Sequence, residues 1–199
     1  MRFVVVAVGM KKPLDERLSD RNRTVPLEIL EIGMGAGANL QFYPENSNLT
    51  ALDINPEFVK VFNKNRKNYP QVNYRRTVLN MAEDMKDVPD SSFDVVINTH
   101  VLCSVQSVND VLKEVKRVLK PGGKYIFLEH VAFPRKEWGY MLQIFVTPIW
   151  NIFFDKCWPI RNNEDSIRKA GFSDVYCETK YPPKLLLYFR PQLLGIAIK

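Results

Sequence analysis

A glycine-rich turn directly after an apolar strand constrains this chain more than any other feature. Leu27 to Ile32 (LEILEI) is predicted to form the first strand, and glycines follow it at positions 33, 35 and 37. Glycine lets the backbone approach a ligand without a side chain in the way, and the N-terminus of a following helix would add amide donors. The turn is therefore predicted to bind a ligand at the end of the first strand.

An acidic residue at the end of the second predicted strand indicates what kind of ligand this is. Leu49 to Ile54 (LTALDI) forms that strand, and Asp53 lies where an acid accepts hydrogen bonds from ribose hydroxyls. The spacing Gly33-x-Gly35-x-x-Ala38 also fits the dinucleotide fingerprint. Loop and acid together predict an adenosine-type cofactor and leave open which one it is. The alternative without a cofactor is that the glycines form a tight turn and Asp53 caps a helix.

The remaining chain alternates strand-like apolar runs with helix-like periodicity, which predicts an α/β domain with a parallel sheet. One helix is expected from Pro56, a second after a Ser107 cap with an apolar stripe over residues 108–119, and a third over 163–170. The run Pro121-Gly122-Gly123 is expected to end the second helix. Five further strands are predicted at Val72–Val78, Phe93–Asn98, Lys124–Glu129, Val175–Lys180 and Leu193–Ile198.

Length and composition indicate a single globular domain. The chain has 199 residues, 46% apolar and 25% charged, which fits one domain over residues 27–199 preceded by a short segment over 1–26. The net charge of +6 is moderate and no long Lys/Arg run occurs, so no nucleic-acid partner is expected. Phe3 to Val8 (FVVVAV) is too short to span a bilayer and is expected to be an opening strand or the start of a truncated chain.

The cysteines and histidines show no metal-binding pattern along the sequence. Three cysteines at positions 103, 157 and 177 are scattered and include no CxxC pair, so reduced thiols are expected. Two histidines, at positions 100 and 130, belong to two separate predicted strands, whose ends they follow, and have no metal-ligand spacing. We therefore expect no metal site.

One segment is unusually aromatic. Trp138 to Trp158 (WGYMLQIFVTPIWNIFFDKCW) contains three tryptophans and four other aromatic residues, and Pro148 is expected to interrupt any single helix there. One interpretation is a pair of core-facing helices. The other is an apolar, lid-like insertion over a substrate pocket that also touches a membrane.

Further motifs distinguish between the possible cofactors. Glu31 stands two residues before Gly33, which gives E-x-G-x-G-x-G. MAED (81–84) follows the third strand, FDVV (93–96) opens the fourth and VLKPGG (118–123) precedes the fifth. In order and spacing these motifs resemble the signature series of class I S-adenosylmethionine-dependent methyltransferases, over roughly Leu27 to Lys199. The resemblance implies S-adenosyl-L-methionine as cofactor and a Rossmann-like fold, with a mostly parallel seven-stranded sheet, an antiparallel C-terminal strand and helices on both faces.

Three longer stretches resemble one family within that class. GAGANLQFYP (35–44), VLCSVQS (101–107) and EHVAFP (129–134) are similar to the methyltransferase-like thiol S-methyltransferases. This resemblance implies methylation of a small alkyl thiol by a microsomal and lipid-droplet-associated protein with an N-terminal hydrophobic anchor. With 26 residues before the first strand, we expect that anchor to be absent. We then expect an intracellular protein, cytoplasmic or peripheral to the endoplasmic reticulum and lipid droplets.

The resemblance also assigns cofactor contacts to individual positions. Four residues of the glycine loop are expected around the methionine half, Asp53 and Asn55 at the ribose, and Thr99 facing the sulfonium. The adenine is expected to lie against residues 81–83, where the class often has Asp or Asn in place of Met81. The full predicted set is Glu31, Gly33, Gly35, Gly37, Asp53, Asn55, Met81, Ala82, Glu83 and Thr99.

Two histidines are the candidates for acid–base chemistry. A thiol acceptor must react as a thiolate, and only a few per cent of a free thiol is ionised near neutral pH. His100 and His130 follow the ends of strands four and five, at the edge where open α/β sheets bind ligands, so either could act as general base. The alternative is that each histidine has no chemical role. Cys103 is expected to be a small packed residue and not a nucleophile.

Three other functions stay open at this point. One is methyl transfer to carbon or oxygen of a hydrophobic acceptor such as a quinone precursor. Another is an NAD-linked oxidoreductase, for which little chain remains to build a hydride-acceptor site. The last is a non-catalytic protein associated with membranes or lipid droplets that retains the fold.

Overall fold

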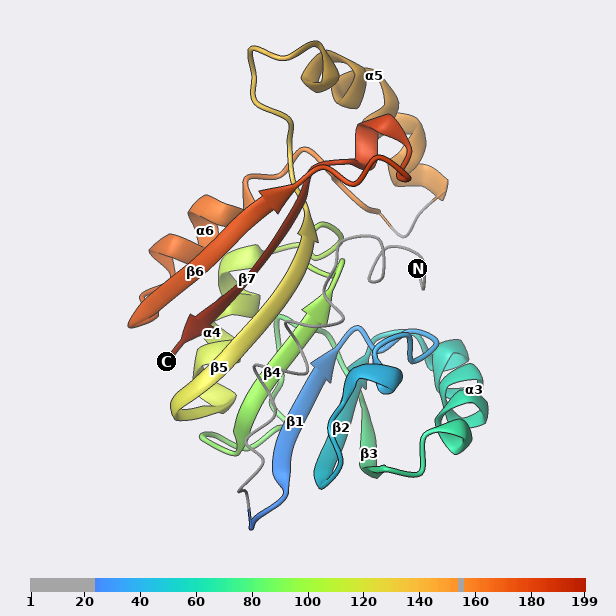
Figure 1. The fold of residues 1–199 in the computed structure, drawn as a ribbon, viewed down its shortest axis with the longest axis vertical. Coiled ribbons are helices and arrows are strands. Elements are labelled where there is room, and N and C mark those ends of the chain that lie inside the picture. The colour runs from blue at the N-terminus through green and yellow to red at the C-terminus, as the bar shows by residue number, and fades with distance from the viewer. Residues whose placement is uncertain (1–23, 154–155) are drawn as a thin grey trace.

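The computed structural model describes residues 24–153 and 156–199, built around a seven-stranded sheet in the order β3-β2-β1-β4-β5-β7-β6 (Figure 1). Strands β1 to β5 pair in parallel, and β7 is antiparallel to both β5 and β6. This arrangement confirms the predicted Rossmann-like fold with its antiparallel C-terminal strand. The strands are β1 (Leu27–Ile32), β2 (Ser47–Asp53), β3 (Val72–Leu79), β4 (Phe93–Thr99), β5 (Leu119–His130), β6 (Asp174–Lys180) and β7 (Gln192–Ile198).

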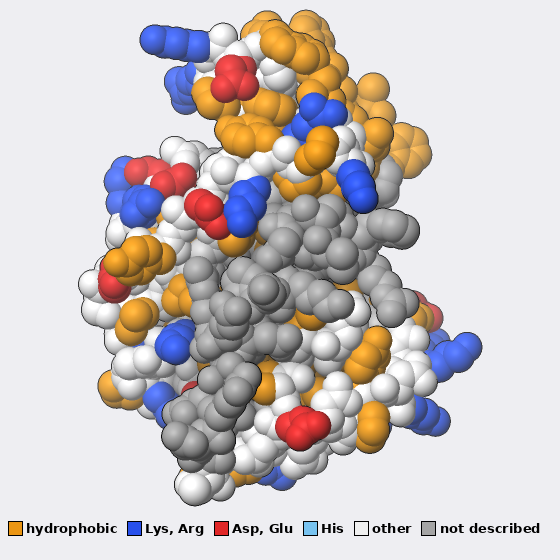
Figure 2. Space-filling view, in the orientation of Figure 1, with side chains coloured by type: hydrophobic (Ala, Val, Ile, Leu, Met, Phe, Trp, Pro, Cys, Tyr) orange, Lys and Arg blue, Asp and Glu red, His pale blue; other side chains and the backbone are white. Residues whose placement is uncertain are grey.

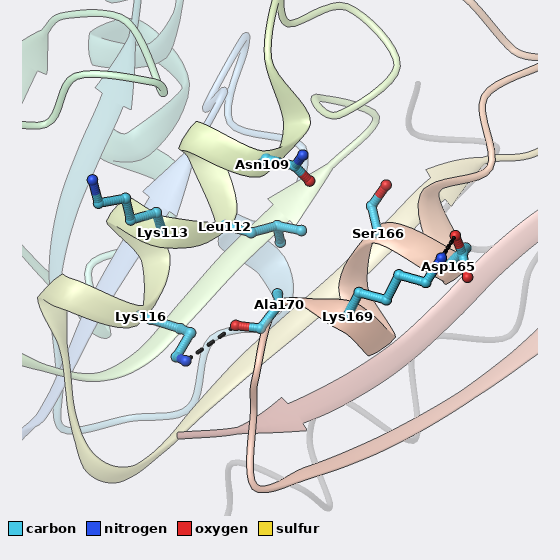
Figure 3. A pocket seen from close by; sticks show the side chains of 8 residues that line it. All are labelled: Asn109, Leu112, Lys113, Lys116, Asp165, Ser166, Lys169 and Ala170. Carbon is cyan, nitrogen blue, oxygen red and sulfur yellow. Dashed lines mark hydrogen bonds and ion pairs between the residues drawn. The ribbon is translucent and has the colours of Figure 1, made fainter.

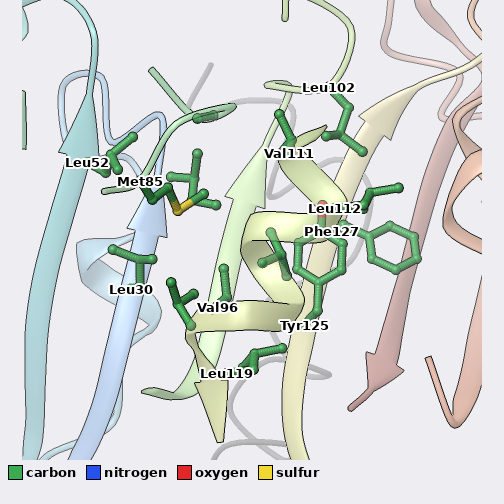
Figure 4. Packing of buried hydrophobic residues seen from close by; sticks show 14 of the residues in the cluster. Leu30, Leu52, Met85, Val96, Leu102, Val111, Leu112, Leu119, Tyr125 and Phe127 are labelled. Atoms are coloured by element: carbon green, nitrogen blue, oxygen red, sulfur yellow. The ribbon is translucent and has the colours of Figure 1, made fainter. Parts of the chain in front are cut away.

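Helices cover both faces of the sheet, as the sequence predicts. α3 (Pro56–Asn65) packs through Phe62 on one face, in a cluster that includes Val95 of β4. α4 (Val108–Val118) and α6 (Asn163–Lys169) pack on the other face, in a cluster that includes Val96 (Figure 4). Because successive strand residues point to opposite faces, β4 contributes alternately to the two clusters. The central strands β2 and β4 are therefore almost wholly buried, whereas β3 and β6 at the two sides of the sheet are more exposed.

The boundary between α4 and β5 differs from the prediction. The sequence places the end of the helix at Pro121-Gly122-Gly123, whereas α4 ends at Val118 and all three residues lie inside β5. Leu119 is already extended (φ −68°, ψ 139°) and pairs with Phe93 of β4. Proline disfavours the helical conformation in the residue before it, so the chain leaves the helix earlier than the glycines alone suggest.

The aromatic segment forms one helix, α5 (Trp138–Phe153), so the expectation that Pro148 interrupts it is wrong. Proline removes one backbone donor from a helix. The neighbouring Thr147 hydroxyl supplies another bond, to the carbonyl oxygen of Gln143 (2.6 Å). No helix among the described residues combines the length and apolar character needed to cross a membrane. The predicted opening strand Phe3–Val8 lies outside the described residues, as do positions 154–155 of the aromatic segment.

Candidate active site

The glycine loop connects β1 to a single 3-10 turn (Leu40–Phe42), where the sequence predicted an α-helix. The chain then enters β2 at Ser47. Gly33, Gly35 and Gly37 all have positive φ, between +48° and +80°. A Cβ on Gly33 would lie 2.4 Å from Val101, and one on Gly37 would lie 2.6 Å from Leu40, whereas one on Gly35 would meet no described atom within 4 Å. Close packing thus requires the outer glycines, and the middle one leaves space for a ligand.

Asp53 holds the glycine loop from the end of β2. Its Oδ2 accepts a hydrogen bond from the Gly35 backbone N–H (2.9 Å), and its Oδ1 accepts one from the Asn55 N–H (2.9 Å). The side chain is buried, and each carboxylate oxygen keeps a second acceptor position. Asp53 therefore lies at the end of β2 beside Gly35 and orients the loop; its contact with a ribose stays a prediction.

A buried polar network joins the loop to the end of β4. The Asn39 amide donates to Oε1 of Glu31 (2.9 Å) and to the hydroxyl of Thr99 (3.1 Å). Oε2 of Glu31 accepts no well-aligned hydrogen bond from the described residues. Burial raises the pKa of Glu31 to about 7, against the lowering effect of the nearby Tyr43 hydroxyl and the Asn39 amide. Sequence reasoning assigned Glu31 and Thr99 but missed Asn39, whose place in the loop motif was the available signal.

The other predicted cofactor residues have structural partners of their own. The Asn55 side chain accepts from the Glu57 N–H (3.0 Å) and caps α3. Glu83 accepts from the Gln106 N–H (2.7 Å), and Ala82 is buried in the core cluster that includes α4. Asn80, one position before Met81, accepts from the Met81 N–H through its Oδ1 (2.8 Å).

The two histidines lie against each other, although they are thirty positions apart in the sequence. Their rings stack with centroids 4.0 Å apart and an interplanar angle of 6°. His100 has a positive φ of 56°, and its Nε2 bonds Oε1 of Gln192 (2.8 Å). Burial lowers the pKa of His100 to about 4, although the bond to Gln192 opposes the change, and burial also lowers the pKa of His130. Both rings are therefore neutral at physiological pH.

Glu129, at the end of β5, organises the loop that follows β4. Its Oε1 accepts from the backbone N–H groups of Val101 and Leu102 (2.8 Å each) and from the Asn98 amide. Its Oε2 accepts from the Cys103 N–H (3.3 Å). Burial raises the pKa of Glu129 to about 7, and the backbone donors limit that rise. Sequence reasoning quoted this residue in a motif but gave it no role, because its partners are at least 26 positions away.

A cavity of about 490 Å³ lies between α4 and the α6 region, away from these residues (Figure 3). Lys116 donates to the carbonyl oxygen of Ala170 (3.1 Å), and Lys169 forms an ion pair with Asp165 (2.8 Å). The cavity shares none of its residues with the predicted site. Its lining consists of Asn109, Leu112, Lys113, Lys116, Asp165, Ser166, Lys169 and Ala170.

Comparison with known proteins assigns this fold and loop to a class. Residues 30–127 match the methyltransferase domain family. The solved structure of Haemonchus contortus phosphoethanolamine N-methyltransferase 2 in complex with S-adenosyl-L-methionine is similar in fold, with a TM-score of 0.66 at 16% identity, covering 96% of this chain and 52% of that one. The domain is thus a class I methyltransferase domain, as the sequence motifs predict.

Two curated relatives define the family more narrowly. Thiol S-methyltransferase TMT1B of Homo sapiens is 43% identical over 171 residues, which is 86% of this chain and 70% of the relative. Thiol S-methyltransferase TMT1A of Homo sapiens is 38% identical over 173 residues, 87% of this chain and 71% of the relative. The chain belongs to the thiol S-methyltransferase family.

Proposed function

We propose that the protein transfers a methyl group from S-adenosyl-L-methionine to a small alkyl thiol. The observation that carries this proposal is the glycine loop, whose middle glycine opens onto free space beside the Asp53 carboxylate. Membership of the thiol S-methyltransferase family supports the choice of a thiol over the carbon or oxygen of a quinone precursor.

The residues present fit this cofactor. Gly35 leaves the loop backbone accessible, and the second lone pairs of Asp53 can accept from ribose hydroxyls. The Glu31 carboxyl lies near the Tyr43 hydroxyl and still has acceptor positions left for a cationic amino group, which would draw it toward the ionised form. S-adenosyl-L-methionine supplies a methyl group activated on a positively charged sulfonium. Asn39 would position Thr99 and Glu31 relative to each other through its two bonds.

The acceptor side requires alignment more than acid–base strength. Methyl transfer to sulfur is an in-line displacement, and holding nucleophile and methyl group in line supplies much of the acceleration. A general base works best with a pKa near the operating pH. The pKa of His100 is lowered to about 4, which makes this residue a weak base at neutral pH. Its role as general base stays a prediction. Any inflection due to His100 in the pH profile is then expected near pH 4.

Alanine at Gly35 is expected to weaken cofactor binding at least about tenfold, because the new Cβ projects into the space at the loop. Gly122 is the matched control: it has a similar positive φ (+73°) and no described atom within 4 Å of its Cβ position, but it lies at the start of β5, at the opposite edge of the sheet. Both variants should lose about 1–2 kcal/mol of stability from backbone strain. Calorimetric titration with S-adenosylhomocysteine measures the difference.

Methyl transfer is then measured with the radiolabelled cofactor over small thiols, phenols and quinone precursors. We expect thiols to accept the label in the native protein and in Gly122→Ala, with Gly35→Ala impaired. Equal affinity for S-adenosylhomocysteine in both variants would contradict the loop assignment. Labelling of quinone precursors in preference to thiols would replace the acceptor class while leaving the loop assignment intact.

We further propose that α5 rests on a lipid surface, which would place the protein peripherally at the endoplasmic reticulum or at lipid droplets. Its buried side holds Gly139, Gln143 and Thr147. Figure 2 shows hydrophobic side chains gathered over α5. They form one exposed stripe at helical spacing, with exposed fractions from 53% to 77%: Trp138, Met141, Phe145, Ile149 and Ile152. An apolar helical face of this kind suits the interface of a bilayer or droplet, and the same segment is the predicted lid over the acceptor.

Serine at both Phe145 and Ile152 is expected to lower binding to lipid vesicles at least about tenfold, because each side chain contributes about 1.5–3 kcal/mol when buried. Flotation with phosphatidylcholine vesicles, with and without phosphatidylserine, measures the bound fraction. Val61→Ser, at an exposed apolar position of α3, is the control and should bind as the native protein does. Unchanged flotation of the double variant would remove α5 from lipid contact.

A further inference from the structure

Three potential metal ligands from distant parts of the chain converge beside the proposed site. Cys103 lies in the loop after β4, His130 ends β5, and Cys157 follows α5. The Sγ atoms of Cys103 and Cys157 and the imidazole nitrogen of His130 all lie within 4.8 Å of one another. Both cysteines are free thiols and buried. This cluster could not be expected from the sequence, because ligand spacing is informative only when the ligands come from one local motif.

The separation of these atoms suits a shared zinc ion. Zinc binds thiolate sulfur at about 2.3 Å and histidine nitrogen at about 2.0–2.1 Å in a tetrahedron, which places S and N about 3.5–3.6 Å apart and two sulfurs about 3.8 Å apart. The Cys157 Sγ to His130 Nδ1 distance is 3.5 Å. The two cysteine sulfurs lie within the 4.8 Å limit of the cluster. An ion can therefore be accommodated with little movement of the side chains.

The charge of the ligand set also suits a divalent cation. Cysteine binds zinc as a thiolate and histidine as a neutral imidazole, so this ligand set supplies two negative charges in all. Binding of Zn²⁺ replaces two thiol protons, which leave to solvent, and forms two sulfur–zinc bonds and one nitrogen–zinc bond. The product is electrically neutral, which avoids leaving an uncompensated charge in the interior.

Contacts around the cluster hold the ligands in place before any ion binds. The Trp158 N–H donates to the carbonyl oxygen of Cys103 (2.7 Å), which ties together the two segments that carry the cysteines. The His130 ring is fixed by stacking on His100 and by contact with Phe189 (centroids 4.9 Å apart). Outer contacts of this kind set the orientation of metal ligands.

We propose that Cys103, His130 and Cys157 form a zinc site. Three protein ligands leave the fourth position of the ion for water or another small ligand, as in zinc sites that are not closed by four side chains. The ion fastens the loop after β4 and the segment after α5 to the end of β5. None of the three ligands belongs to the cofactor loop, so zinc binding can be tested without any assay of methyl transfer.

The test uses the full chain, reduced and stripped of metal with a chelator, then titrated with Zn²⁺ against a chromophoric competitor. The native protein should bind one zinc per chain. Loss of an outer-shell partner alone costs about 10–100-fold in metal affinity, so Cys103→Ser and Cys157→Ser should bind at least about 100-fold more weakly. Cys177→Ser is the matched control, because Cys177 lies outside the cluster and contacts Arg168 and Glu164 instead. It should bind zinc as the native protein does.

A second measurement does not depend on the variants folding. Co²⁺ added to the native protein should give the intense visible bands of a tetrahedral ion together with thiolate-to-metal charge transfer. A weak octahedral spectrum without thiolate bands would overturn the proposal. Equal zinc affinity in Cys157→Ser and the native protein would do the same. A Cys103–Cys157 disulfide that forms readily in the native protein, with no zinc uptake after reduction, would show a redox pair in place of a metal site.

Discussion

Alanine in place of Asp53 is expected to lower the affinity for S-adenosylhomocysteine about 5- to 150-fold, which corresponds to about 1–3 kcal/mol for hydrogen bonds to a charged group. The loss has two physical sources. The ligand loses an acceptor for its ribose hydroxyls, and the Gly35 N–H loses the carboxylate that orients it. Calorimetric titration measures the affinity, and Asp53→Asn, which retains one acceptor oxygen, should give an intermediate value.

Asp94 provides the matched control for this carboxylate. It also accepts from a backbone N–H, that of Glu28 (2.9 Å), and it pairs with Lys120 (2.7 Å), but it opens β4 at the opposite edge of the sheet. Asp94→Ala should cost stability and leave the affinity for S-adenosylhomocysteine unchanged. An Asp53→Ala variant that binds within twofold of the native protein would show that the carboxylate supports only the loop and not the ligand.

The strands and helix caps of this fold could be predicted because each depends on residues that are neighbours in the sequence. Alternating apolar runs identified all seven strands, and the predicted bounds of β1 match the observed ones. Ser107 caps α4 by accepting from the Asp110 N–H (3.3 Å), as its spacing indicates. The prediction for the aromatic segment was wrong, because a proline there competes with residues that otherwise favour a helix. Pro148 has the local signature of a helix break, yet α5 continues through it, with the Gln143 and Thr147 side chains buried on its inner side.

The site itself could be predicted only in part, because much of it depends on contacts between distant residues. Gly33, Gly35 and Asp53 stand in recognisable motifs, and they lie together in the structure. The stacking of His100 on His130 depends on the adjacency of β4 and β5, which places the ends of these two strands side by side. The convergence of Cys157 on His130 depends in addition on the path of the chain after α5. No spacing rule along one sequence contains that information.

The role of Glu129 also could not be predicted from the sequence, because its partners are distant along the chain. Its replacement by alanine has the largest expected effect on stability. Glu129→Ala would leave the backbone N–H groups of residues 101–103 and the Asn98 amide without their buried acceptor. An orphaned buried donor costs about 1–3 kcal/mol, so the loss should exceed about 3 kcal/mol in the free energy of unfolding. Because Val101 packs on Gly33, the disturbed loop should also weaken cofactor binding. Glu129 is a positioning residue, since it acts through this loop.

Glutamine at the same position separates the acceptor role from mere packing. Three of the four donors bond Oε1, so a glutamine that keeps its oxygen there loses only the longer contact to the Cys103 N–H. Glu129→Gln should therefore retain most of the stability and the affinity for S-adenosylhomocysteine that Glu129→Ala loses. Urea unfolding measures the difference, with Glu178→Ala, an exposed glutamate on β6, as the control. Equal destabilisation by glutamine and alanine would contradict this role.

The pH dependence of unfolding gives an independent check on Glu129. Its pKa is about 7 in the folded chain and about 4.5 when exposed, so the folded state binds more protons between these values. The contribution of Glu129 to the free energy of unfolding is then largest at low pH and is lost as pH rises through 7. Glu129→Gln cannot lose that proton, so its unfolding free energy should fall less between pH 5 and pH 8 than that of the native protein. The remaining slope should combine two contributions: a fall from Glu31, whose pKa is raised to about 7 by the same cause, and an opposing rise below about pH 6.5 from His100 and His130, whose pKa values are lowered. An identical slope in Glu129→Gln and the native protein would show that Glu129 is already ionised in the folded chain at pH 5.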